Sequence, residues 1–322
     1  MSEHQFTRRD ALRTAVAGLP LLAGTSIAGG DTPKDPRSAG TIPIGIATLG
    51  FRDRTNAKLA AELQQAGIRI VQLFLSQSDS NYWRYNGRND VSDMTPDRCK
   101  TIADAYRQAG ITIDSIGVYT NLIHPDAAER EANLAYFDAM MKVGRHMGVD
   151  TFITEAGHYK PEKLEPGPPY DFRGATWDVA LQTFKQLGAM AQKNEAKVLV
   201  EPFFQGFFAS AKRTRVFLEE LDCPRIRVLL DPANLIELNT LDEMFAQLTP
   251  WIDCLHAKDR KLHSERGVAA GKGDLDYVAF VRLAAQYTPG VPLILEYVDA
   301  TTYQAARDHL RRAIHDAGLQ YR

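Results

Sequence analysis

Cysteine is scarce in this sequence. Its 322 residues include three cysteines, Cys99, Cys223 and Cys254, and none of them stands in a C-x-x-C pair. The odd number and the lack of paired spacing argue against a disulfide framework. Cys254 lies two residues before His256, and we expect it to be an inert thiol in the core.

A surplus of positive charge is also missing. The formal net charge is −2, and lysine and arginine do not cluster. This balance argues against nucleic acid or an acidic membrane as the main partner. The mildly apolar run at residues 14–28 is too short and too rich in glycine and alanine to span a bilayer well. A stable membrane anchor is therefore not expected.

The N-terminus carries the features of an export signal. Arg8 and Arg9 precede the apolar run, which ends in small residues at Ser26 and Ala28. This order predicts a twin-arginine signal peptide over residues 1–28 and a location in the periplasm or outside the cell. Residues 29–40 contain mainly Gly, Asp, Pro and Ser, and they are expected to form a disordered linker.

From residue 41 onward, short apolar runs alternate regularly with amphipathic helical patterns. Eight strand–helix units in about 280 residues predict a single (β/α)8 TIM barrel over residues 41–322. An open doubly wound sheet is the alternative, but no glycine-rich fingerprint follows the first strand. Thr95 followed by Pro96 predicts a helix start. The first four strands are expected at 43–48, 68–75, 111–118 and 151–155, and helices at 56–66, 126–147, 177–194, 213–221, 241–248, 277–285 and 303–317.

Four apolar runs in the second half of the chain each end on a residue that can bind a divalent cation. The runs VLVE, VLLD, IDCLH and LILE end at Glu201, Asp231, His256 and Glu296. In a (β/α)8 barrel the carboxyl ends of the strands meet at the mouth, where active sites lie. Three carboxylates crowded there raise one another's pKa, and a cation removes that penalty. This donor set suits one Mn²⁺, Mg²⁺, Co²⁺ or Zn²⁺ ion.

The ordered motifs LVEPF, LLDPANL, LHAKD, GKGDLD and LILEY resemble those of the xylose-isomerase-like superfamily of sugar isomerases and epimerases. The resemblance covers residues 42–317 and implies that the four residues above bind one divalent metal. It also implies that Glu201 and Glu296 act as an acid/base pair. The endonuclease IV branch of the superfamily fits poorly, because its three-metal site needs several more histidines at strand ends than this chain has.

Two neighbouring motifs extend the comparison. Lys258 and Asp259 match the family's H-x-K-D element, so Lys258 is expected to donate to a substrate or enediolate oxygen, and Asp259 to orient Lys258 or His256. Asn234 departs from the pattern, because many relatives carry a histidine there. The GKGD segment at residues 271–274 is expected to be a tight structural turn.

Other side chains near strand ends are expected to contact a sugar. Glu155 ends the fourth strand and His158 follows it, while Asn234 stands three residues after Asp231. A salt bridge to a lysine of the barrel is the alternative role for Glu155. Aromatic side chains offer flat faces to the C–H side of a sugar ring. Those expected to do so are Trp83, Tyr119 and Phe203, although Phe203, Phe204, Phe207 and Phe208 are equally suited to plugging the upper barrel layer.

Together these features predict an exported, divalent-metal-dependent sugar isomerase or epimerase. Glu201 and Glu296 would remove and return a proton on opposite faces of an enediolate. Elimination from a keto-sugar or keto-glycoside shares the first step and is the alternative outcome. A non-catalytic periplasmic carbohydrate-binding module is the alternative from another class. The expected partner is a small carbohydrate, and the sequence allows a homo-oligomer.

Overall fold

Eight parallel strands close into a barrel. The structure is a computed structural model that describes residues 41–159, 170–264 and 266–322. The last barrel strand pairs with both the first and the seventh, so that Leu293 lies opposite Ile44 on one side and Leu255 on the other. The predicted (β/α)8 architecture is confirmed. The barrel strands are β2 (Ile44–Ala47), β3 (Ile70–Leu73), β4 (Thr112–Gly117), β5 (Thr151–Thr154), β6 (Lys197–Val200), β7 (Ile226–Leu230), β8 (Ile252–Arg260) and β10 (Leu293–Leu295).

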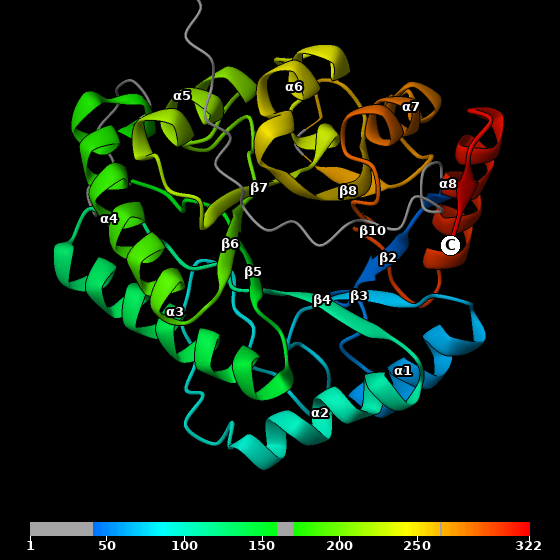
Figure 1. Ribbon diagram of the computed structural model, residues 1–322, viewed down its shortest axis with the longest axis horizontal. Helices are drawn as coiled ribbons and strands as arrows, with labels where there is room; N and C mark the ends of the chain where they lie inside the picture. Colours follow the sequence, from blue (N-terminus) through cyan, green and yellow to red (C-terminus); the bar gives the residue numbers. More distant parts are fainter. Residues whose placement is uncertain (1–40, 160–169, 265) are drawn as a thin grey trace, which may run out of the picture. The chain divides into compact units, whose positions relative to one another are not determined.

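Eight α-helices are found in the described part of the chain. Figure 1 shows that helices surround the strands. Their ends follow local chemistry: the Thr95 hydroxyl accepts the N–H of Arg98 with Pro96 in the first helical position. Gly148 ends another helix in the left-handed region at φ 76°. The helices are α1 (Asn56–Gln65), α2 (Pro96–Gln108), α3 (Ala127–Met147), α4 (Gly174–Lys193), α5 (Ala211–Leu221), α6 (Leu241–Leu248), α7 (Tyr277–Tyr287) and α8 (Tyr303–Asp316).

The core has two layers because each barrel strand is buried on both faces. Most apolar side chains pack between the strands and the helices. Alternate strand residues point into the barrel, where they form a smaller cluster with the aromatic residues that follow β3 and β4. Cys254 belongs to this inner cluster as a fully buried thiol, as expected. The inner cluster consists of Ala47, Phe74, Tyr119, Ile153, Leu199, Leu229, Cys254 and Ile294.

Strand β8 is longer than the sequence suggested. The run IDCLH was expected to end at His256, but the strand continues to Arg260. It does so because β9 (Gly267–Ala269) returns antiparallel beside it, with Lys258 opposite Ala269. The first and last described strands, β1 (Thr41–Ile42) and β11 (Gln320–Tyr321), pair with each other outside the barrel.

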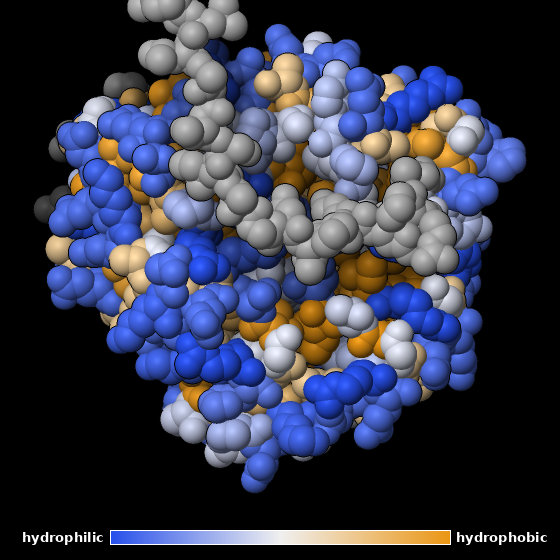
Figure 2. Space-filling model, in the orientation of Figure 1, coloured by the Kyte–Doolittle hydropathy of each residue, from blue (hydrophilic) through white to orange (hydrophobic). Residues whose placement is uncertain are grey.

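The face drawn in Figure 2 is mainly hydrophilic, with hydrophobic residues exposed in patches toward its middle. In the described part of the chain, no helix combines the length and hydrophobicity that a membrane crossing needs. The predicted signal peptide at residues 1–28 and the linker at residues 29–40 lie outside the described residues.

Candidate active site

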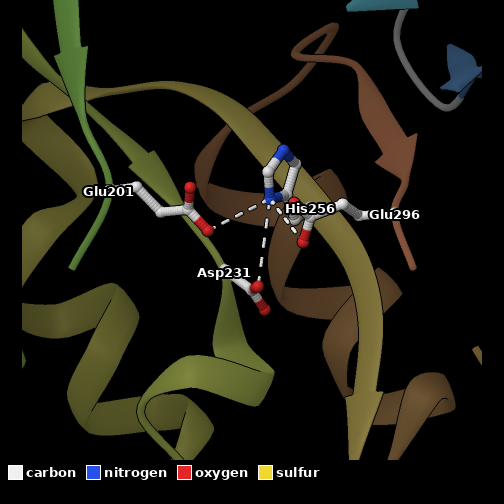
Figure 3. A group of neighbouring side chains, drawn as sticks. All are labelled: Glu201, Asp231, His256 and Glu296. Carbon is white, nitrogen blue, oxygen red and sulfur yellow. Dashed lines mark ion pairs between the residues drawn. The ribbon is translucent and has the colours of Figure 1, made fainter. Parts of the chain in front are cut away.

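Four side chains converge at the mouth of the barrel. Glu201, Asp231 and Glu296 each follow directly on a strand, β6, β7 and β10, while His256 lies within β8. One ligand atom from each lies within 4.8 Å of the others, and all four residues are buried. Figure 3 shows the carboxylates pointing at Nδ1 of His256. The distances from this nitrogen are 3.3 Å to Glu201 Oε1, 3.4 Å to Glu296 Oε2 and 3.8 Å to Asp231 Oδ2.

Local contacts hold each of these groups in place. Asp231 begins a short 3-10 helix (Pro232–Asn234), and its Oδ1 accepts the N–H of Ala233, which leaves Oδ2 turned to the cluster. Nε2 of His256 lies 2.7 Å from Oε1 of Gln72 on β3. Since an amide oxygen only accepts, the imidazole carries a proton on Nε2 and turns Nδ1 toward the carboxylates.

The residues of the cluster fit a divalent cation. Nδ1 of His256 is a buried atom without a hydrogen-bond partner in the described residues, and Oδ2 of Asp231 has only the ion-pair contact with Nζ of Lys258 at 2.7 Å. A lone pair facing three carboxylate oxygens is repulsive unless a proton or a metal lies between them. Burial lowers the pKa of His256, but the negative charges of Glu296 and Glu201 outweigh it and hold the pKa well above its ordinary value. The cluster therefore attracts positive charge at the position of Nδ1.

A lysine supplies part of that positive charge. Nζ of Lys258 lies 2.7 Å from Asp231 Oδ2 and 3.2 Å from Glu296 Oε2. It also donates to Oδ1 of Asn234 at 2.9 Å. Burial raises the pKa of Glu296, but the positive charges of Lys258 and His256 outweigh burial and lower it to about 2. Glu296 is therefore ionised at neutral pH.

The two glutamates of the cluster are held differently. Oε2 of Glu201 accepts the hydroxyl of Tyr119 at 2.6 Å, and Oε1 accepts the amide of Asn234 at 2.9 Å. Oε2 of Glu296 accepts from Lys258. No donor in the described part of the chain bonds to Oε1 of Glu296, which lines the adjoining cavity. The free carboxylate oxygen thus belongs to Glu296.

A cavity of about 310 Å³ opens over the cluster. This volume lies at the lower end of the range for small-molecule sites. Most of the predicted substrate contacts lie on its wall, although their roles stay predictions. They are Trp83, Tyr119, Glu155, Phe203, Asn234 and Lys258, together with Glu201 and Glu296 of the cluster.

Several predicted contacts lie elsewhere. His158 does not line this cavity but a small one of about 10 Å³ beside it, and its backbone is paired with the side-chain amide of Asn121. Phe207 and Phe208 are almost fully buried in the core. Asp259 was expected to orient Lys258 or His256. Its oxygens instead accept the backbone N–H groups of Arg260, Gly271 and Leu275, so it ties down the predicted GKGD turn.

Sequence reasoning missed some residues that shape the site. Gln72 is a fully buried polar residue within an otherwise apolar strand. Tyr297 lines the cavity directly after Glu296, with its ring centroid 4.5 Å from Nζ of Lys258 and its backbone at φ 55°. A positive φ in a bulky residue is rare and tends to occur at functional sites. The only sequence signals were a glutamine in an apolar strand and a tyrosine beside a candidate ligand.

The comparison with protein families decides the identity of the fold. The model of the xylose isomerase-like TIM barrel family matches residues 60–313. The chain belongs to this family. No functionally curated protein matches it in sequence. The xylose isomerase-like resemblance seen in the strand-end motifs is therefore confirmed.

Solved structures of xylose isomerase-like barrels share this fold at low identity. A 3-keto-D-glucoside 4-epimerase from E. coli is 14% identical with a TM-score of 0.66, over 84% of this chain and 100% of that one. A probable 3-DHS dehydratase from Bacillus anthracis is 16% identical with a TM-score of 0.64, over 84% and 97%. A xylose isomerase-like protein from Mycobacterium smegmatis in complex with magnesium is 18% identical with a TM-score of 0.62, over 86% and 98%.

Proposed function

We propose that this chain is a divalent-metal-dependent enzyme that removes a proton from the carbon next to a sugar carbonyl, with isomerisation or epimerisation as its main outcome. One observation carries the proposal: Nδ1 of His256 meets three carboxylates within 4.8 Å at the bottom of a cavity. Buried carboxylates gather in this way where a cation offsets their repulsion. Family membership and an epimerase among the structural neighbours support the same reaction class.

Glu201, Asp231, His256 and Glu296 are the residues that would hold the metal. Their oxygen and imidazole donors suit Mn²⁺, Mg²⁺, Co²⁺ or Zn²⁺, and one structural neighbour is a magnesium complex. A divalent metal at this place polarises a sugar carbonyl and makes the neighbouring C–H more acidic.

Glu296 is the base in this account. Its Oε1 has no donor among the described residues, and the residue lines the cavity, so this oxygen is available to a substrate carbon. The positive charges of Lys258 and His256 keep the carboxylate ionised at neutral pH, so Oε1 carries the lone pair that a general base needs. Lys258 lines the same cavity, and the positive charge of its ammonium group can stabilise a developing enediolate oxygen. Glu201, whose two oxygens accept hydrogen bonds from Tyr119 and Asn234, is the group that returns the proton on the opposite face.

The cavity wall suits a sugar. Trp83 and Tyr119 lie with ring centroids 6.3 Å apart, and Phe203 lines the cavity with them. Aromatic rings bind the C–H face of a sugar, while carboxylates and amides bind its hydroxyls. A small carbohydrate is therefore the proposed substrate class.

Elimination is a second candidate outcome, and Glu155 is the observation that favours it. This carboxyl lines the cavity without belonging to the metal cluster. Burial and the nearby charge of Glu201 raise its pKa to about 7. A protonated carboxyl near an ionised one is the arrangement that acid/base pairs use.

The enzyme is also proposed to be exported. Arg8, Arg9 and the apolar run that follows them support a twin-arginine signal, and the periplasm is the proposed location. A substrate met there is expected to be a free sugar or a glycoside.

Incubation of the metal-loaded enzyme with a panel of keto-sugars, ketoses and glycosides in D₂O tests the reaction class. Deuterium is expected at the carbon next to the carbonyl, measured by mass spectrometry and NMR. Binding without exchange across the panel would favour a carbohydrate-binding module. Product without exchange would point to a hydride shift, with Glu201 and Glu296 serving as ligands alone.

A further inference from the structure

Glu155 is a carboxyl on the cavity wall whose surroundings differ from those of the metal cluster. It follows β5 directly, and its Oε2 accepts the hydroxyl of Tyr85 at 2.7 Å. It has no ion-pair partner among residues 41–159, 170–264 and 266–322, whereas Glu296 contacts Lys258. The Glu155 carboxyl thus lines the cavity without being one of the metal-cluster residues and without an ion pair in the described part of the chain.

Three aromatic residues that contact one another, Trp83, Tyr85 and Tyr119, line the cavity together with Glu155, which is itself largely removed from solvent. The ring of Tyr85 lies 6.4 Å from those of Trp83 and Tyr119, and these two are 6.3 Å apart. Burial first, and then the charge of Glu201, raise the pKa of Glu155 to about 7, against the lowering effect of the Tyr85 hydroxyl and Lys258. These surroundings favour the protonated form of Glu155 more than water would favour that of an exposed carboxyl.

The proton of the Glu155 carboxyl can take part in elimination, whereas epimerisation does not need it. Epimerisation returns a proton to the carbon that lost it. The cluster already contains a second carboxylate, Glu201, for this step. Elimination must also release an oxygen as a leaving group, and an alkoxide leaves slowly unless it is protonated as the bond breaks. A separate acid on the cavity wall can do this while the base holds the abstracted proton.

We infer that Glu155, held by Tyr85, is the general acid that protonates the departing oxygen of a keto-glycoside, which makes the enzyme a lyase on substrates with a leaving group β to the carbonyl. This inference rests on the proposed function, because proton removal by Glu296 comes first. The C–H electron pair becomes a C=C bond, the C–O bond breaks, and its pair stays on the oxygen, which takes the proton of Glu155. The products are an unsaturated keto-sugar and an alcohol. Glu296 then gives its proton to solvent and Glu155 regains one.

The test compares two keto-glycosides of the same sugar, one with an alkyl and one with a nitrophenyl leaving group. Nitrophenolate leaves without protonation, so the Glu155→Gln variant should release nitrophenol within ~10-fold of the wild-type rate. Release of the alkyl alcohol should fall by roughly 10²–10⁴-fold, the usual contribution of general acid catalysis. Deuterium exchange next to the carbonyl should persist in the variant.

Two further variants test the hydrogen bond to Glu155 and provide a control. Tyr85→Phe keeps the carboxyl but removes its hydrogen bond, and should slow alkyl release selectively by about 3- to 10-fold. Glu220→Gln is the matched control, because Glu220 also accepts a hydrogen bond from an aromatic donor, Nε1 of Trp177, but lies on α5 outside the cavity. It should match the wild type with both substrates.

Three outcomes would overturn the inference, and they are distinguishable. Equal losses of alkyl and nitrophenyl release in Glu155→Gln would make Glu155 a binding residue. Wild-type exchange without release of any alcohol would exclude elimination and leave the proposed proton removal standing. Neither exchange nor release with any substrate would refute the proposed function itself, and this inference with it.

Discussion

Nε2 of His256 on β8 lies 2.7 Å from Oε1 of Gln72 on β3, although the two residues are 184 positions apart in the sequence. Both residues are fully buried, and their strands are not neighbours in the barrel. The contact therefore crosses the barrel interior. It fixes both the ring orientation and the tautomer that presents Nδ1 to the three carboxylates.

Replacing Gln72 by Leu should weaken metal binding by about 10- to 100-fold, the usual effect of losing the hydrogen bond behind a histidine ligand. Isothermal titration calorimetry of the metal-free variant with Mn²⁺ or Mg²⁺ measures the change. Gln77→Leu is the matched control, because Gln77 is a buried glutamine that bonds to the backbone oxygen of Thr48 rather than to the cluster. Equal affinities in Gln72→Leu and wild type would show that the imidazole is oriented by other contacts.

Elemental analysis should find one divalent metal per chain in the wild type and almost none in Asp231→Ala. A chelator should remove the metal and lower the melting temperature, since a cation at 100 times its Kd stabilises the fold by about 2.7 kcal/mol. Asp253→Ala is the control, because Asp253 pairs with Lys197 and Arg227 and is not part of the cluster. Equal metal content in wild type and Asp231→Ala would refute the site.

The stability of the metal-free protein should fall between pH 5 and 8 through Glu155. Its pKa is raised from 4.5 to about 7 in the folded state, by burial first and then by the charge of Glu201. A raised pKa means that the fold favours the neutral acid, so this contribution is complete below about pH 4.5 and is lost as the pH rises through about 7. The loss should amount to about 1–3 kcal/mol, because a shift of one pKa unit corresponds to about 1.4 kcal/mol and the carboxyl keeps some contact with solvent.

Urea unfolding of chelator-treated protein at several pH values measures this loss. Glu155→Gln should remove the part of the slope between about pH 5 and 6.5, because an amide does not ionise in this range, and keep the part at higher pH to which the raised pKa of His256 contributes. Glu220→Gln should keep the wild-type slope. Parallel profiles for wild type and Glu155→Gln would show that the ionisation of Glu155 is not linked to folding.

Much of the site was predictable because its residues follow strand order. Glu201, Asp231 and Glu296 each stand directly after an apolar run, and closing a parallel barrel brings such positions together. Gln72 was not predictable in this way, since its role depends on a contact between distant strands. The end of β8 was also missed, because its continuation depends on pairing with β9 and not on its own hydrophobic pattern.

Side-chain directions were harder still. Asp259 occupies a family motif position, but its role follows from three backbone N–H groups that meet only after the GKGD turn has formed. His158 also follows a strand end, but it lines a small cavity beside the main one. There its backbone pairs with the side-chain amide of Asn121. Sequence spacing places a residue near the mouth, whereas packing decides which way its side chain turns.

Export should depend on the paired arginines at residues 8 and 9. A reporter fused after residues 1–40 should reach the periplasm through the twin-arginine route, and replacing Arg8 and Arg9 by Lys should block it. Cell fractionation with and without a functional twin-arginine translocase measures the result. Export that survives the double substitution would indicate an ordinary secretory signal.

The rate of deuterium exchange in Glu296→Gln tests the central claim most directly. The amide oxygen of glutamine can still bind the metal, so metal content, measured in parallel, should stay near one ion per chain. Exchange at the carbon next to the carbonyl should fall by roughly 10²–10⁴-fold, because the variant lacks the base. Glu220→Gln should exchange at the wild-type rate. Undiminished exchange in metal-loaded Glu296→Gln would contradict the assignment of Glu296 as the group that removes the proton.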